Sequence, residues 1–114
     1  MIGKDTILSQ LKFILVQYRA DLNRELYFTK KKSILSSLSE FEKHLNQLFY
    51  ATTSNLVKLE YTEEEYFEII ETNMNQINIT EHFKNCDDTD KELIAKVYAS
   101  TKNKIEEGLK KAKE

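Results

Sequence analysis

Hydrophobic side chains recur every three or four positions along most of the chain, the spacing that places them on one face of an α-helix. Within residues 5–26 this stripe consists of Ile7, Leu11, Ile14, Tyr18 and Leu22. The following segment repeats the pattern with Ile34, Leu38, Phe41, Leu45 and Leu48. Both segments are therefore predicted to be helices that bury their apolar stripes in a common core.

The first of these helices carries a second apolar set almost opposite the first, formed by Phe13, Val16, Ala20 and Tyr27. At about 100° per residue the two sets are separated by roughly half a turn. A helix that is apolar on two faces usually lies at the centre of a bundle or contacts a second chain. We favour the central position and keep contact with a partner, including a second copy in a homodimer, as the alternative.

The junction between the two helices, near Phe28–Ser33, contains neither Gly nor Pro. A continuous rod of roughly 45 residues would leave its apolar seam uncovered, which implies a long-helix dimeric coiled-coil arrangement. However, the three lysines Lys30–Lys32 suit the C-terminal turn of a helix, where the helix dipole favours positive charge. We therefore favour a break at 28–33 and a helical hairpin.

Two further helices have marked starting points. The sequences Thr-Glu-Glu-Glu at 62–65 and Thr-Asp-Lys-Glu at 89–92 match the capping box, in which a threonine and a glutamate each pair with the other's backbone N–H. The apolar stripes that follow are Phe67, Ile70, Met74 and Ile77, then Ile94, Tyr98, Thr101, Ile105 and Leu109. Residues 80–83 form a candidate extra turn. The chain is thus predicted to be one all-α domain, residues 1–114, folded as an antiparallel bundle of about four helices.

Composition narrows the possibilities further. Two glycines and no proline argue against a β-sandwich or barrel, which needs frequent turn residues, and against a glycine-rich phosphate loop. Cys86 is the only cysteine, so no disulfide can form within the chain. Without a long apolar run or a signal-peptide cleavage site, we expect no membrane insertion and a cytoplasmic location. Fifteen lysines against two arginines is a bias typical of AT-rich coding DNA, which points to a bacterial or phage source.

Acidic residues are concentrated in one part of the sequence. Residues 62–92 hold ten acidic and two basic side chains, while residues 1–61 carry a small positive excess. In the third predicted helix, Glu64, Glu68 and Glu71 fall on one flank, away from the apolar stripe. A negative surface of this kind repels nucleic acid and attracts a protein with a basic surface.

The residue types that usually carry catalysis or metal binding are not arranged for it. His44 and His82 lack the Glu-x-x-His spacing of di-metal helical bundles. Cys86 follows His82 by four residues, yet the chain offers no glycine-bearing turn for an oxyanion site. We therefore expect no catalytic residue, no cofactor and no metal ion, and we do not expect an enzyme.

These patterns indicate a protein that acts by binding. We expect a non-enzymatic protein-binding module of the inhibitor, immunity, anti-defence or adaptor type, which covers a surface of its partner. The predicted contact residues are Glu64, Glu68 and Glu71 on the acidic flank and Phe13, Val16 and Tyr27 on the second face of the first helix. The alternative is a nucleic-acid-associated regulatory factor that uses the basic corner at Lys30–Lys32, although the overall charge makes nucleic acid the less favoured partner.

Overall fold

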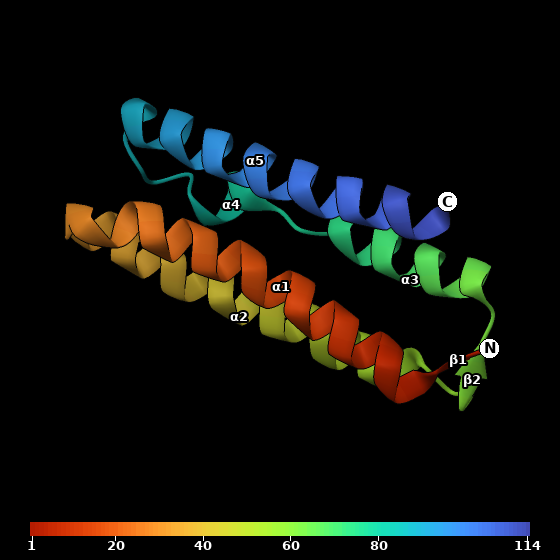
Figure 1. Ribbon diagram of the computed structural model, residues 1–114. Helices are drawn as coiled ribbons and strands as arrows, with labels where there is room; N and C mark the ends of the chain where they lie inside the picture. Colours follow the sequence, from red (N-terminus) through yellow and green to blue (C-terminus); the bar gives the residue numbers. More distant parts are fainter.

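The computed structural model covers residues 1–114 and consists of four long helices and one single-turn helix (Figure 1). The long helices are α1 (Lys4–Leu26), α2 (Lys32–Asn55), α3 (Glu63–Asn75) and α5 (Asp88–Lys113), and the short one is α4 (Ile79–His82). α1 and α2 run in opposite directions along one side of the molecule, while α3, α4 and α5 lie along the other (Figure 1). The predicted all-α bundle of about four helices is confirmed, and α4 lies within one residue of the expected extra turn.

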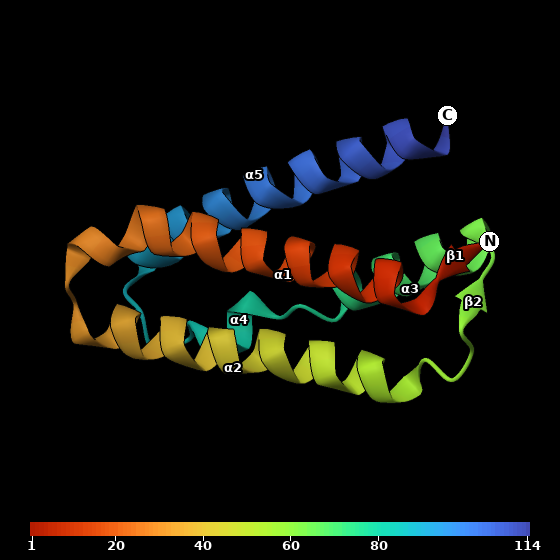
Figure 2. The ribbon, with the colours of Figure 1, turned by 60° about the horizontal axis from the view of Figure 1, so that its bottom comes forward.

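The chain reverses between α1 and α2. A 3-10 turn, η1 (Tyr27–Thr29), follows α1, and Lys30 then adopts a left-handed backbone conformation with φ of 52°. The helical hairpin is therefore confirmed, and the long-helix dimeric coiled-coil arrangement is wrong (Figure 2). The lysines do not end the first helix as expected, because Lys31 is the N-cap of α2 and Lys32 its first residue. Their charges lie at the positive end of the α2 dipole, an unfavourable placement that Asp87 and Asp90 offset for Lys31.

The core lies between the inward faces of the four long helices. The predicted stripes of α1 and α3 are buried throughout, and that of α2 is buried apart from the half-buried Leu48. In α5, Ile94 and Thr101 are buried and the rest of the stripe is half-buried. The largest fully enclosed apolar side chains include Tyr18, Phe41, Leu11, Leu22, Leu26 and Ile70. Removing these side chains from water is the main favourable contribution to folding.

α1 occupies the central position expected for it, between α5 and α2 (Figure 2). Its second apolar set nevertheless lies outside the core, since Phe13 is 66% exposed and Val16 39% exposed. The expectation that a central position would cover both faces is wrong. Both neighbouring helices pack on the main stripe, which Leu15 and Leu26 widen, and the opposite face stays open to solvent.

The two predicted capping boxes have different outcomes. At the start of α3, the Thr62 hydroxyl accepts a hydrogen bond from the Glu65 N–H at 3.1 Å, and the Glu65 carboxylate accepts one from the Thr62 N–H at 3.0 Å. This box is confirmed. α5 begins at Asp88, one residue before the second box, and its N-cap Asp87 makes no side-chain capping hydrogen bond. Thr89 therefore lies inside the first turn, and the second capping box is wrong.

A short β-ladder closes one end of the bundle. β1 (Ile2–Gly3) pairs antiparallel with β2 (Glu60–Tyr61), and Ile2 lies opposite Tyr61. The Lys4 N–H donates to the Leu59 carbonyl at 2.8 Å next to this ladder. The pairing ties the start of α1 to the segment that leads into α3, and strands of two residues are too short to leave a periodic signal in the sequence.

One carboxylate is buried between α1 and α5. Asp21 accepts hydrogen bonds from the Thr101 hydroxyl at 2.6 Å and from the Gln17 side-chain amide at 2.9 Å. Burial by itself would raise the pKa of Asp21, but these hydrogen bonds, with Lys104 and Arg24 nearby, hold the pKa below its ordinary value. The ionised side chain thereby links the central helix to the last one.

Candidate functional site

A shallow groove runs along the outer side of the α1–α2 pair, the side that faces away from the core. One hollow of about 620 Å³ lies near the turn and another of about 210 Å³ lies farther along, and Glu42 lines both. The outer apolar lining consists of Val16, Ala20, Tyr27, Phe28, Leu35, Phe49 and Tyr50. Phe13 precedes Val16 by one helical turn on the same face of α1. We call these eight residues the hairpin groove.

Four aromatic side chains provide most of the exposed apolar surface of the hairpin groove. Phe28 is 81% exposed, Tyr50 68%, Phe13 66% and Tyr27 61%. A fully accessible aromatic side chain offers about 150–250 Å², so together these four present roughly 500 Å². The largest apolar patch on a monomeric protein usually measures about 300–600 Å², and such patches are often contact surfaces.

The charged side chains in the hairpin groove are mostly paired within the chain. Arg19 from α1 and Glu42 from α2 form an ion pair across the seam, with 2.8 Å between Nη1 and Oε1. Arg24 lies 3.3 Å from the buried carboxylate of Asp21. Among the charged lining residues, only Lys12 has no acidic partner. The groove is therefore close to neutral and presents mainly apolar contacts.

Glu64, Glu68 and Glu71, here called the acidic flank, line one side of α3 and are exposed. The C-terminal turn of α5 reaches this side of the molecule, where Lys113 Nζ lies 2.7 Å from the Glu71 carboxylate. The same ammonium group lies 5.0 Å from the centre of the Phe67 ring. One of the three negative charges is thus paired within the chain, while those of Glu64 and Glu68 have no ion-pair partner.

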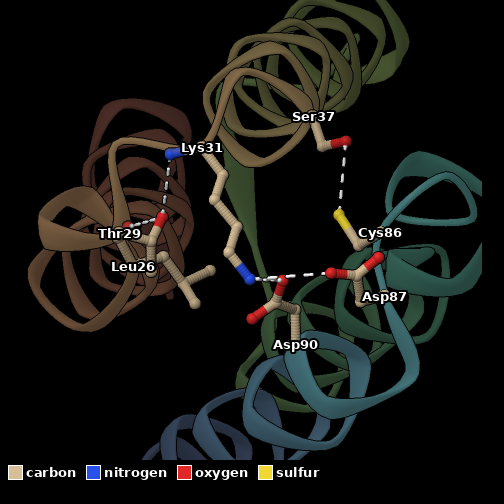
Figure 3. A network of polar contacts seen from close by, with 7 residues as sticks. All are labelled: Leu26, Thr29, Lys31, Ser37, Cys86, Asp87 and Asp90. Atoms are coloured by element: carbon tan, nitrogen blue, oxygen red, sulfur yellow. Dashed lines mark hydrogen bonds and ion pairs between the residues drawn. The ribbon is translucent and has the colours of Figure 1, made fainter.

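The basic corner, Lys30–Lys32, is partly neutralised. Lys31 Nζ lies 2.9 Å from the Asp90 carboxylate and 3.6 Å from that of Asp87, both at the start of α5 (Figure 3). The hydrogen bond that Lys31 donates to Asp90, together with the negative charge of that carboxylate, raises the pKa of Lys31. This contact joins the turn after η1 to α5, so Lys30 and Lys32 alone remain without ion-pair partners.

The two histidines meet, although they are distant in the sequence. The rings of His44 on α2 and His82 on α4 stack with 4.6 Å between their centres. His44 Nε2 accepts a hydrogen bond from the Asn78 N–H at 3.3 Å, which requires the nitrogen to be unprotonated. Burial, and then the neighbouring His82, lower the pKa of His44. The pair fastens the short helix α4 to α2.

The single cysteine side chain is shielded from solvent. Cys86 is buried, and its sulfur lies 3.8 Å from the Ser37 hydroxyl (Figure 3). No three side chains of His, Cys, Asp or Glu gather closely enough to hold a metal ion.

The structure places the six predicted contact residues on two separate surfaces. Phe13, Val16 and Tyr27 belong to the hairpin groove, and the three glutamates lie on α3 on the other side of the bundle (Figure 1). Sequence reasoning missed Phe28 in η1, and it missed Leu35, Phe49 and Tyr50 on α2. For the residues on α2, the available signal was their position off the buried stripe of that helix, as apolar residues that this stripe does not need.

Comparisons with known protein families, curated proteins and solved structures found no significant match to this chain. No helix of the bundle combines the length and the apolar character that crossing a membrane requires. What the hairpin groove and the acidic flank do must therefore be inferred from their own geometry and chemistry.

Proposed function

We propose that the protein is a non-enzymatic binding module that acts by covering a surface of another protein, as inhibitors, immunity and anti-defence proteins and adaptors do. The observation that carries this proposal is the hairpin groove. A chain of this size has enclosed its core side chains well and still leaves Phe13, Tyr27, Phe28 and Tyr50 mostly exposed on one face. Exposing so much aromatic surface costs solubility, and contact with a protein explains it.

The physical properties of the two surfaces suit different parts of a binding event. Aromatic side chains in an apolar groove supply the contacts that contribute most to affinity in protein interfaces. The unpaired charges of Glu64 and Glu68 act over a longer distance and favour the approach of a protein with a basic surface. A cytoplasmic location and a bacterial or phage origin belong to this proposal as well.

The alternative, a nucleic-acid-associated factor, draws less support from the geometry. Phosphate binding depends on free positive charges. At the basic corner one of three lysine charges is already paired, because Lys31 contacts Asp90 at 2.9 Å. Retention on nucleic acid that falls steeply with salt would favour this alternative over the protein-binding proposal.

The direct test is affinity capture from the native cells with identification of the captured protein. The test variant carries Phe28→Ser and Tyr50→Ser, one substitution at each end of the hairpin groove. The control carries Val57→Ser and Leu59→Ser, since these side chains are 87% and 82% exposed but lie outside the groove. We expect the groove variant to recover at least about tenfold less of the partner, because aromatic anchors contribute about 1 kcal/mol or more each. Equal recovery by both variants would contradict the proposal.

The contribution of the acidic flank is tested separately, once the partner is known. Reversing Glu64, Glu68 and Glu71 to Lys should slow association at low salt, and the deficit should shrink as salt rises and screens the charges. A variant that reverses only Glu64 and Glu68 leaves the contact between Glu71 and Lys113 intact and controls for local disruption. Association rates that match those of the wild type at every salt concentration would remove the acidic flank from the binding surface.

A further inference from the structure

We propose that the hairpin groove is the interface of a symmetric homodimer, in which a second copy of the chain covers it. This inference rests on the proposed function in one respect, namely that the groove is a protein contact surface. It goes further by naming a second copy of the chain as the occupant of the groove, which leaves the acidic flank as the surface for another protein. The area of the groove, its charge and its internal symmetry support this inference.

The exposed area matches what one side of a dimer needs. A standard protein interface takes about 800 Å² from each partner, and somewhat more than half of that area is apolar. The four exposed aromatic side chains of the groove supply roughly 500 Å². Tyr27, Phe28 and Tyr50 line the two hollows of the groove. Phe13 lies one helical turn from Val16 on the same face of α1, so we expect one contact on this side of the hairpin to reach all four.

The charge of the groove favours a copy of itself over a strongly charged partner. Three of the four charged lining side chains are already paired within the chain, which leaves Lys12. A highly acidic or basic surface would therefore gain little here. The groove of a second copy presents the same nearly neutral apolar surface, so the two copies repel each other little.

The distribution of residues along the groove fits a two-fold axis near its middle. Arg19 and Glu42 form their ion pair there, and a two-fold rotation brings each of them close to the oppositely charged residue of the other copy. Two small residues, Ala20 and Ser39, line the adjoining stretch of the groove and permit close approach of the helices. In this arrangement Tyr27 and Phe28, next to the turn of one copy, contact Phe13 and Tyr50 at the far end of the groove of the other copy.

A dimer of this form leaves the acidic flank free. α3 lies on the side of the bundle opposite the α1–α2 pair (Figure 1). Each dimer would therefore present two acidic flanks, pointing away from the interface, to a protein with a basic surface.

Sedimentation equilibrium over about 1–300 μM protein tests the inference. We expect the wild type to shift from monomer to dimer within this range, as suits an interface of modest size. Phe28→Glu and Tyr50→Glu should each weaken dimerisation at least about 30-fold, because each places a charge in the apolar contact. Val57→Glu, which adds the same charge to an exposed apolar position outside the groove, should dimerise like the wild type. Circular dichroism checks that all variants remain folded.

A charge exchange tests the proposed axis. Arg19→Glu and Glu42→Arg should each weaken the dimer, and the double variant should restore it, because the exchanged charges attract both within and between copies. A wild type that stays monomeric to 300 μM would overturn the dimer but not the proposed function, which stands if capture of a different protein depends on the groove. A dimer that survives Phe28→Glu and Tyr50→Glu would use another face and would also overturn the inference.

Discussion

The two faces of α1 carry the same sequence signal and end in opposite environments. The inner face, with Leu11, Tyr18 and Leu22, is almost completely enclosed by the neighbouring helices. On the outer face Phe13 is 66% exposed and Tyr27 61% exposed, although both are large aromatic residues. On both faces the apolar residues recur with helical spacing. The spacing alone therefore does not tell which face is buried.

The difference between the faces lies in what covers them. The inner face of α1 faces both α2 and α5, whereas nothing within the chain packs on the outer face. The inner face therefore contributes to the stability of the fold. The outer face contributes to it very little, and its apolar character is what the proposed role as a contact surface would explain.

The largest expected effect is the difference between the two faces of α1 in what they contribute to the free energy of unfolding. Leu22 is 1% exposed, and Leu22→Ala should lower the free energy of unfolding by about 2–5 kcal/mol because it leaves a cavity. Phe13→Ser on the outer face should change that free energy by less than about 0.5 kcal/mol, although it removes a larger side chain. Urea unfolding of both variants at low protein concentration, where the chain is monomeric, provides the comparison. Similar losses for both would mean that the outer face is covered within the monomer.

A second prediction concerns Asp21, the buried carboxylate on the inner side of α1, which Thr101 of α5 contacts. Thr101→Val removes the hydroxyl that donates to Asp21 at 2.6 Å and leaves a buried carboxylate short of one hydrogen bond. The free energy of unfolding should fall by about 1–3 kcal/mol. Thr6→Val, an exposed position on the same helix as Asp21, serves as the matched control and should change little. Equal effects of the two valines would show that Asp21 is not anchored through Thr101.

The two capping boxes extend the comparison to helix starts, where the same sequence signal again has two outcomes. Thr62→Ala should cost about 1 kcal/mol, since it removes the acceptor for the Glu65 N–H. Thr89→Ala should change stability by no more than about 0.3 kcal/mol, because Thr89 lies within the first turn of α5 and caps nothing. Thermal or urea unfolding distinguishes the two. A comparable loss at Thr89 would show that Thr89 is the N-cap and that α5 begins two residues later, at Asp90.

The smallest expected effect is the pH dependence that His44 contributes. Its pKa lies below the ordinary value in the folded chain, so the unfolded chain takes up the proton first as the pH falls. The stabilisation by neutral His44 is therefore complete above about pH 6.5 and is progressively lost below it. His44→Gln retains an acceptor for the Asn78 N–H and does not titrate, so it should lose less stability than the wild type between pH 7.5 and 5.5. Identical losses would assign the pH dependence to other groups.

Local signals in the sequence were sufficient for the helices, the buried stripes and the first capping box, because each depends on residues within one or two turns. Contacts between distant segments were not predictable in this way. Lys31 contacts Asp90, and His44 contacts His82, only once the helices have packed together. The sequence also misplaces the start of α5, because the pattern at 89–92 matches a capping box that does not form. The helix begins at Asp88, and Asp90 in its first turn contacts Lys31. The outer face of α1 was recognised as apolar, but its exposure depended on where α5 packs.

We propose above that the outer face of the α1–α2 pair is a contact surface. Site-specific photo-crosslinking in the native cells tests it most directly, with a photoreactive phenylalanine analogue at Phe28 in the hairpin groove and at Val57 outside it. Both positions are more than 80% exposed in the free chain, so exposure alone does not distinguish them. We expect light-dependent crosslinks from position 28 to one defined polypeptide, either this chain or another protein, and few from position 57. Crosslinking at position 28 that does not exceed the level at position 57 would contradict it.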